Sequence, residues 1–317
     1  MSEPTKNTVA VIVPTWRRPK DLERCLLALY RQTVLPTRVI VAYKEDDDLT
    51  IETFHSLQAS KPPSVAVSCV SVPPQGNVVT QQTAALGLTS EAIVAITDDD
   101  AEPRSDWIER LLGCFEDPAI GGVGGRDWQP IERWDEPTVG KLLWYGKTIG
   151  NHHLGVGPAR DVEILKGVNC AFRGDLLREI GFDPKMRGRG TVINWELALS
   201  FAMLRKGYRL VYDPAICVDH HISVRQDGDV NQRGGFEPAS LFDNVHNEVL
   251  SIFGHLSPVK KIVYLAWSEL VGTRGNPGLV QVIRLMAIRA DRPVIVLRKY
   301  LVSLRARWRA LVTWGIG

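Results

Sequence analysis

Short apolar runs alternate with helix-like patterns along the first third of the chain. Continuous apolar runs predict strands buried on both faces at 9–13 and buried at 38–42, and further strands are predicted at 64–72 and 92–97. Apolar residues at helical spacing predict helices at 21–32 and 79–88. Strands that alternate with helices in this way indicate an α/β unit with a mostly parallel sheet, which ends near residue 120.

The pattern changes beyond this point. Residues 121–125 form a glycine-rich strand or turn, and 127–165 are irregular and rich in Trp, His and Gly. We then predict helices at 176–180 and 195–206, a strand at 208–218, and a series of helices from Phe242 onward. With 44% hydrophobic residues among 317, the chain can bury a sizeable core, which excludes disordered and collagen-like classes.

Two acidic clusters directly follow predicted strands. Residues 45–48 read Glu-Asp-Asp-Asp, and 98–100 are three consecutive aspartates. Ligands of open α/β sheets bind at the carboxyl ends of the strands. Three adjacent carboxylates repel one another unless a cation or solvent screens them, and oxygen ligands suit Mg²⁺ or Mn²⁺ bound together with phosphates. A solvated surface loop is the alternative interpretation of Asp98–Asp100.

The turn after the first strand argues against two nucleotide-binding folds. It reads Pro-Thr-Trp-Arg-Arg-Pro at 14–19 and contains no glycine, whereas a dinucleotide-binding fold or a P-loop needs a glycine-rich turn there. The glycines at 121–125 match neither spacing, and we interpret them as structural.

Several short motifs share an order and spacing with a known family. They are Val11–Thr15, the helix at 22–33, the acids from Glu45, the aspartate triplet with Pro103 and Trp107, and the segments 167–173, 205–209, 212–214 and His220. Over residues 8–222 the chain resembles family 2 glycosyltransferases. The resemblance implies a GT-A type fold, a Rossmann-like, mostly parallel sheet flanked by helices. We expect a catalytic domain at 1–240, with nucleotide-binding (1–120) and acceptor-binding (121–240) halves, and a basic, mostly helical C-terminal extension at 241–317.

The resemblance also implies the roles of individual residues in the nucleotide site. Pro14, Thr15 and Arg17 or Arg18 would line the nucleotide pocket, and Glu45 or Asp46 would hydrogen-bond the base. Asp98 would lie near the ribose or uridine, and Asp99 or, preferably, Asp100 would hold a metal that bridges the phosphates. His220 matches a histidine that closes the site near the metal in some relatives, although a histidine after a strand is as often simple polar surface.

The catalytic base is the point at which the sequence departs from the family pattern. Many relatives carry Glu-Asp at the start of the helix after the glycine loop, where this chain has Ile193-Asn194. An amide cannot accept the proton, so we predict Glu196 as the base. Asp183 and Asp161 are the fallback candidates. The alternative for Glu196 is a purely structural role, because an acid in the first helical turn stabilises the helix dipole.

The acceptor site is expected in the aromatic middle of the chain. We assign Trp128, Asn169 and Trp195 to it, and Trp134, Trp144 and Tyr145 also lie in this region, although aromatic residues more often form core. The pair His152-His153 has no cysteine or third histidine close by, which disfavours a zinc site.

Charge is unevenly distributed along the chain. From Val271 onward there are nine of the 38 basic residues and one of the 36 acids, a local charge of +8, so the rest of the chain carries −6. The segment 280–317 combines arginines with apolar stripes and two tryptophans, which is typical of helices that bind a membrane surface. Packing on the acidic body or on another subunit is the alternative. No nucleic-acid motif accompanies the charge.

The remaining features concern location. Five widely spaced cysteines without a C-x-x-C pair indicate small buried residues in a reducing compartment. The N-terminus has no signal-like apolar stretch, and no apolar run is long enough to span a bilayer. We therefore expect a cytoplasmic protein, either free or attached to the cytoplasmic face of a membrane.

Together these observations predict a metal-dependent, inverting glycosyltransferase. It would use Mg²⁺ or Mn²⁺, a UDP- or GDP-sugar donor, and a carbohydrate or lipid-linked acceptor, as in polysaccharide or glycolipid synthesis. A degenerate, non-catalytic scaffold is one alternative, for which Asn194 is the best support. A sugar-phosphate nucleotidyltransferase is the other, although it would need a glycine-rich basic loop after the first strand.

Overall fold

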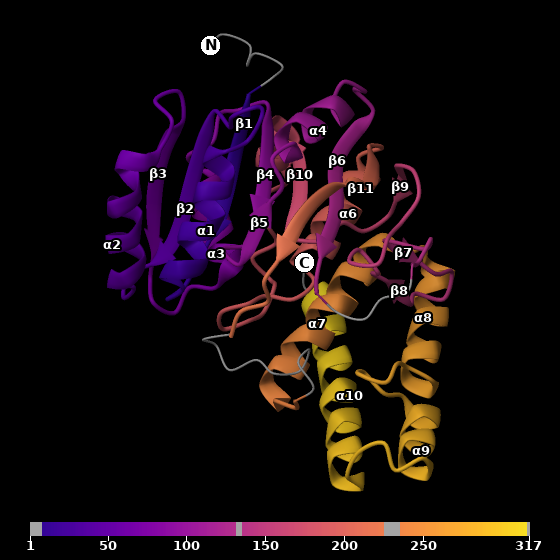
Figure 1. The fold of residues 1–317 in the computed structure, drawn as a ribbon. Coiled ribbons are helices and arrows are strands. Elements are labelled where there is room, and N and C mark those ends of the chain that lie inside the picture. The colour runs from indigo at the N-terminus through magenta and orange to yellow at the C-terminus, as the bar shows by residue number, and fades with distance from the viewer. Residues whose placement is uncertain (1–7, 131–134, 225–234, 316–317) are drawn as a thin grey trace.

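The computed structural model describes residues 8–130, 135–224 and 235–315. A sheet of nine strands forms the body of the molecule, with the strand order β3-β2-β1-β4-β10-β6-β11-β5 and with β9 paired to β11 (Figure 1). Helices cover both faces of this sheet, and four further helices extend from the edge at which β1, β2 and β4 end (Figure 1).

The N-terminal half of the sheet is parallel, as predicted. It contains β1 (Val9–Pro14), β2 (Arg38–Lys44), β3 (Ala66–Val72) and β4 (Ile93–Thr97). Its helices are α1 (Pro19–Tyr30), α2 (Asp48–Ser56), a 3₁₀ turn η1 (Leu57–Ser60) and α3 (Val78–Leu86). Every residue of β1 and of β4 is buried, because helices pack on both faces, and this explains their continuous apolar runs.

The second half makes the sheet mixed rather than mostly parallel. β10 (Asn169–Arg173) runs antiparallel to both of its neighbours, β4 and β6 (Ile120–Trp128), while β11 (Arg209–His220) is parallel to β6. The other elements of this half are β5 (Ala101–Pro103), α4 (Trp107–Cys114), β7 (Lys141–Leu142), β8 (Thr148–Ile149), β9 (Arg160–Val162), α5 (Gly174–Ile180) and α6 (Trp195–Arg205).

The chain ends in four helices, as the sequence predicts: α7 (Pro238–His255), α8 (Pro258–Leu270), α9 (Leu279–Ala287) and α10 (Pro293–Gly315). Residues of α7, α8 and α10 share one hydrophobic cluster with Leu197 and Phe201 of α6. This cluster joins the extension to the body. Among the described residues, no helix is both long enough and apolar enough to cross a membrane.

All five cysteines are free, which agrees with the sequence prediction. Cys25, Cys170 and Cys217 are buried, whereas Cys69 and Cys114 are half-buried.

The glycine-rich strand β6 is structural, because one of its glycines allows a close backbone contact. A Cβ atom on Gly125 would lie 1.7 Å from the carbonyl oxygen of Ile216, within the irregular stretch of β11 between Asp213 and Cys217. A Cβ atom on Gly113, which lies in α4, would meet nothing within 4 Å.

We therefore expect Gly125→Ala to lower the free energy of unfolding by about 1–3 kcal/mol or more, because the strands must separate to admit the methyl group. Gly113→Ala is the matched control. It should be neutral or stabilise the chain by up to about 1 kcal/mol, since alanine favours a helix interior. Urea unfolding of the two variants checks the prediction, and equal effects would refute it.

Candidate active site

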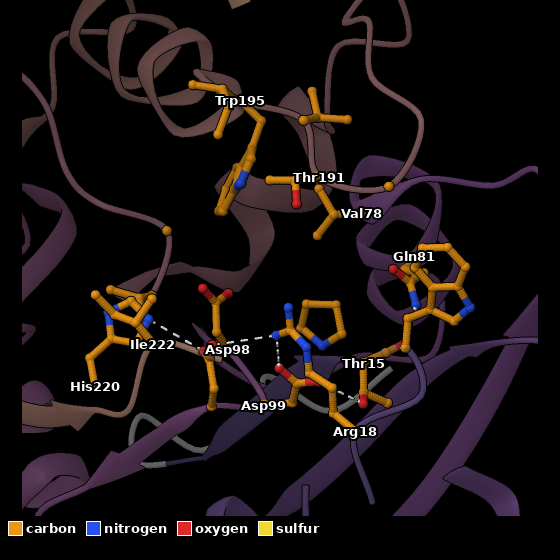
Figure 2. Close-up of a pocket in the computed structure, with 18 of the residues that line it drawn as sticks. Thr15, Arg18, Val78, Gln81, Asp98, Asp99, Thr191, Trp195, His220 and Ile222 are labelled. Atoms are coloured by element: carbon orange, nitrogen blue, oxygen red, sulfur yellow. Dashed lines mark hydrogen bonds and ion pairs between the residues drawn. The ribbon is translucent and has the colours of Figure 1, made fainter. Parts of the chain in front are cut away.

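A cavity of about 420 Å³ opens at the carboxyl ends of β1, β2 and β4. Turns and helix starts from both halves of the chain line it, and they bring together residues far apart in sequence (Figure 2). The lining residues used below are Pro14, Thr15, Trp16, Arg18, Lys44, Gln81, Asp98–Asp100, Lys166, Gly190–Ile193, Trp195, Glu196 and His220.

The aspartate triplet enters this cavity directly from the buried strand β4. Asp99 is only 3% exposed and accepts hydrogen bonds from Thr15 Oγ1 and Arg18 Nη1, both at 2.8 Å. Asp100 turns toward the other side, where it accepts the backbone N–H of Ser223 at 2.9 Å and lies 3.3 Å from His220 Nε2. Asp98 points into the cavity on the side of Trp195 (Figure 2).

The three carboxylates have different proton affinities because their surroundings differ. Burial raises the pKa of Asp99 to about 7, despite the opposing charge of Arg18. Burial alone would also raise the pKa of Asp100, but hydrogen bonding to His220 prevails and lowers it to about 2. Burial raises the pKa of Asp98, and the charge of Asp100 adds to this effect. A cation bound beside Asp98 would favour its ionised form.

Asp98, Asp100 and His220 each offer one ligand atom, and these atoms all lie within 4.8 Å of one another. Within the described part of the chain, this is the single such group of acidic, histidine or cysteine side chains. Two carboxylates, of which one faces the cavity, suit a hard divalent cation that keeps positions for phosphate oxygens. The residues present thus fit Mg²⁺ or Mn²⁺, with Asp98 and Asp100 as the main donors.

A second carboxylate, which the sequence did not predict, lies beside His220. Asp127, fully buried at the end of β6, lies 3.7 Å from His220 Nδ1 and 2.6 Å from Lys166 Nζ. Burial alone would lower the pKa of His220, but Asp100 and Asp127 together raise it to about 9. Lys166 and His220 hold the pKa of Asp127 well below its usual range against its burial. The sequence feature that could have indicated Asp127 is a charged residue at the end of a glycine-rich strand.

The predicted nucleotide-binding residues divide into two groups. Pro14, Thr15, Asp98 and Asp99 line the cavity, as expected. Arg17, Glu45 and Asp46 do not: Arg17 has a left-handed backbone (φ 55°), and its side chain bonds Asp46 at 2.9 Å. All three side chains are largely exposed, and the arginine that enters the cavity is Arg18, the alternative left open by the sequence.

Asp47, the third acid of the cluster at 45–48, explains why Glu45 and Asp46 lie outside the cavity. Asp47 is buried and caps α2, where its carboxylate accepts hydrogen bonds from Thr50 and from the backbone N–H of Arg17. The helix therefore begins inside the acidic cluster and turns Glu45 and Asp46 outward. A cap of this kind is a common use of aspartate.

Trp16 and Lys44 are among the cavity residues that the sequence did not predict. Lys44 Nζ lies 3.8 Å from the centroid of the Trp16 ring, and both residues line the cavity beside Gln81, which donates to the carbonyl oxygens of Thr15 and Ala42. The Trp16 indole N–H is buried without a hydrogen-bond partner among the described residues. An aromatic face, a cation and a free donor can together bind a nucleotide.

Glu196 lines the cavity in the first turn of α6, and burial raises its pKa to about 7. Asn194, which takes the place of the expected acid, is the N-cap residue with a left-handed backbone (φ 72°), and its side chain donates to the carbonyl of Asn244 in α7. The fallback acids Asp161 and Asp183 do not line the cavity; Asp161 pairs with Arg209 at 2.8 Å.

Of the residues expected at the acceptor site, some line the cavity and others do not. Trp195 lines the cavity and packs on Gly167, whereas Trp128 does not line it. Asn169 belongs to the core: it is fully buried, accepts the Trp107 indole N–H at 2.8 Å and donates to the carbonyls of Arg126 and Ile216. Its contacts account for its position without a ligand.

The other aromatic candidates lie outside the cavity. Trp144 is exposed, and Tyr145 packs against Trp267 of α8. His152 is buried and its Nε2 lies 2.9 Å from the carbonyl of Ile164, whereas the neighbouring His153 lines the cavity. Trp134 lies outside the described residues.

Comparison with known proteins agrees with this geometry. A family model described as "Glycosyltransferase like family 2" matches residues 4–234. The chain belongs to glycosyltransferase family 2. The resemblance inferred from the motifs is thereby confirmed.

Curated relatives of this glycosyltransferase are distant in sequence. "Pre-mycofactocin glycosyltransferase" of Mycobacterium tuberculosis is 26% identical over 234 residues, which cover 71% of this chain and 45% of the relative. "Glucosyl-dolichyl phosphate glucuronosyltransferase" of Haloferax volcanii is 28% identical over 139 residues, 41% of this chain and 43% of the relative. The chain thus spans about half the length of these relatives.

Solved structures confirm the GT-A fold. "Mannosyltransferase PcManGT" from Pyrobaculum calidifontis, in complex with GDP-Man and Mn²⁺, aligns with a TM-score of 0.59 and 17% identity over 97% of this chain and 90% of its own. GalNAc-T7 with UDP, GalNAc and Mn²⁺ gives a TM-score of 0.65 at 13% identity, over 90% of this chain and 54% of its own. At these identities the likeness concerns the fold.

The contacts of Asn169 predict a structural role for it. Asn169→Ala should lower the free energy of unfolding by about 1–3 kcal/mol, because the Trp107 N–H and two carbonyls lose their partner. The KM for the donor should change little at a temperature at which the variant is folded. Unfolding and steady-state kinetics of the same preparation check both parts, and an unchanged stability with a raised KM would contradict them.

Proposed function

We propose that this family 2 glycosyltransferase moves a sugar from a nucleoside-diphosphate sugar to an acceptor hydroxyl in one displacement that inverts the anomeric centre, with Mg²⁺ or Mn²⁺ as cofactor. The observation that carries the proposal is that a candidate cation site and a carboxylate of raised pKa, Glu196, line the same cavity. The first can hold the diphosphate and the second can accept a proton.

The donor end of the cavity is the side of β1, β2 and β4. Trp16, Lys44 and Arg18 provide an aromatic face and two cations next to the aspartate triplet. One structural neighbour is in complex with GDP-Man and Mn²⁺ and another with UDP, GalNAc and Mn²⁺, which supports a GDP- or UDP-sugar here. A divalent cation held by Asp98 and Asp100, with His220 beside them, would neutralise charge on the leaving diphosphate.

The acceptor end is the side of α6. Glu196 would take the proton of the incoming hydroxyl while Trp195 flanks the sugar and Lys166 holds positive charge nearby. A base whose pKa lies near 7 is well matched to proton transfer at neutral pH. We propose a carbohydrate or lipid-linked acceptor, as in polysaccharide or glycolipid synthesis. The similarity to a glucosyl-dolichyl phosphate glucuronosyltransferase supports a lipid-linked one.

Hydrolysis of UDP- and GDP-sugars with Mg²⁺ or Mn²⁺ tests the proposal directly. Release of the nucleoside diphosphate that depends on the metal supports a transferase. Binding of donors without any turnover would instead indicate a non-catalytic scaffold. In a parallel assay with added pyrophosphate, formation of a sugar 1-phosphate and a nucleoside triphosphate would indicate a nucleotidyltransferase.

Glu196→Gln should reduce transfer at least about 10²-fold while donor affinity stays within a small factor, because the amide keeps the shape but cannot accept a proton. In the wild type, transfer should rise with pH through about 7 and then level off, since only the ionised carboxylate is active. This ascending limb should be lost in the variant. Asp161→Asn, which alters an acid outside the cavity, is the matched control. Near-normal turnover of Glu196→Gln would refute the assignment.

Asp98→Asn combined with Asp100→Asn should abolish metal-dependent donor binding, because two of the three proposed metal ligands lose their charge. Calorimetric titration of UDP and GDP, with and without Mn²⁺, measures the effect. Asp46→Asn serves as the control, since this acid is exposed and does not line the cavity. Equal metal-dependent affinity in the double variant and the wild type would rule out the site.

A further inference from the structure

The α9–α10 tip, defined as residues 279–301, projects away from the sheet. α10 packs on α7 within the hydrophobic cluster of the extension, and the connection between α9 and α10 lies at the far end from the body (Figure 1). The tip therefore lies away from the sheet, although Lys299 Nζ lies 5.7 Å from the centroid of the Phe236 ring just before α7.

Large apolar side chains are exposed over this tip. Ile283 is 69% and Val294 68% exposed, and the other exposed apolar residues of the tip are Leu279, Val280, Ile288, Leu297 and Leu301. Among the described residues, 14 of the 19 exposed large hydrophobic side chains belong to the segment from α8 to α10. Patches of this kind mark interaction sites.

The exposed large apolar residues of α10 form one stripe, except Trp314, whose ring packs on Phe253 of α7. Val294, Leu297, Leu301, Trp308 and Val312 recur at intervals of three, four or seven residues, which places them on one face of the helix. The buried residues, including Val296, Ser303, Ala306 and Ala310, lie at other positions and form the packed side of the helix. α10 thus has one apolar stripe toward the protein and another toward solvent.

Positive charge surrounds the exposed residues of the tip. Arg284, Arg289, Arg292, Arg298 and Lys299 lie within it, and its one acid, Asp291, bonds Lys299 at 3.0 Å. Two copies of the chain that met through this face would bring these arginines together, which opposes association. An anionic lipid surface complements both the charge and the apolar residues.

We infer that the α9–α10 tip binds the surface of an anionic bilayer: Ile283, Ile288, Val294 and Leu297 enter the boundary between head groups and acyl chains, and the arginines contact lipid phosphates. The sheet edge that carries the cavity faces the helical extension (Figure 1). Binding through the tip would therefore hold the cavity on the membrane side of the body.

Co-sedimentation of the full chain with phosphatidylcholine vesicles, with and without phosphatidylglycerol, tests the inference. The wild type should partition at least about tenfold better onto the anionic vesicles, and added salt should reduce the difference. Ile283→Ser with Val294→Ser should lower binding to anionic vesicles about tenfold or more, since each removes exposed apolar area. Arg284→Gln with Arg298→Gln should reduce the preference for phosphatidylglycerol.

Leu49→Ser with Leu88→Ser is the matched control, because both residues are exposed apolar side chains of the catalytic body. This control should bind vesicles like the wild type, and all variants should keep the wild-type melting temperature and donor turnover without vesicles. Absence of wild-type binding, or equal binding of the Ile283/Val294 variant, would overturn the inference. So would sedimentation velocity that shows a dimer which the same variant dissociates, because the tip would then be an interface between copies.

Discussion

Negative charge concentrated at the end of one buried strand is the constraint on which this site depends. β4 ends in three carboxylates, and burial opposes the ionisation of all of them. Asp99 is stabilised by Thr15 and Arg18, and Asp100 by His220 and a backbone N–H. Asp98, directed into the cavity, is left for a ligand. A cation bound at this point would offset the free-energy cost of burying ionised carboxylates.

Asp127 also takes part in these charge interactions, through His220. This buried carboxylate pairs with Lys166 and lies beside His220. The imidazole of His220 therefore lies between Asp100 and Asp127. The lysine in turn stands near Glu196 and opposes the rise of its pKa. Groups from β4, β6, β11 and α6 are thereby coupled. Because β10 is antiparallel to both β4 and β6, and β11 is parallel to β6, the strands β4, β6 and β11 run in one direction and their carboxyl ends meet at the cavity.

Apolar runs and helical spacing were sufficient to predict the parallel half of the sheet, since strands buried on both faces leave an unambiguous pattern. The predictions missed α2, α4 and β10, which are short elements whose existence depends on a cap or on neighbouring strands. The same limit applies to the site. Thr15, Asp98–Asp100, Glu196 and His220, which lie at strand ends or at a helix start, line the cavity; their roles stay predictions. Glu45 and Asp46 were misplaced relative to the cavity because Asp47 caps α2. Asn169 was expected at the acceptor but is held in the core by Trp107.

The helical extension is structurally coupled to the cavity and is not a mere appendage. Asn247 of α7 is fully buried, accepts the backbone N–H of Arg187 and donates to the carbonyls of Arg187 and Ile193. Asn194 donates to the carbonyl of Asn244. These bonds hold the segment 187–194, and its residues Gly190–Ile193 form one wall of the cavity. α7 also packs on α10, so the wall beside Glu196 and the extension belong to one packed unit. The position of this wall therefore depends on residues that lie beyond the family's matched segment.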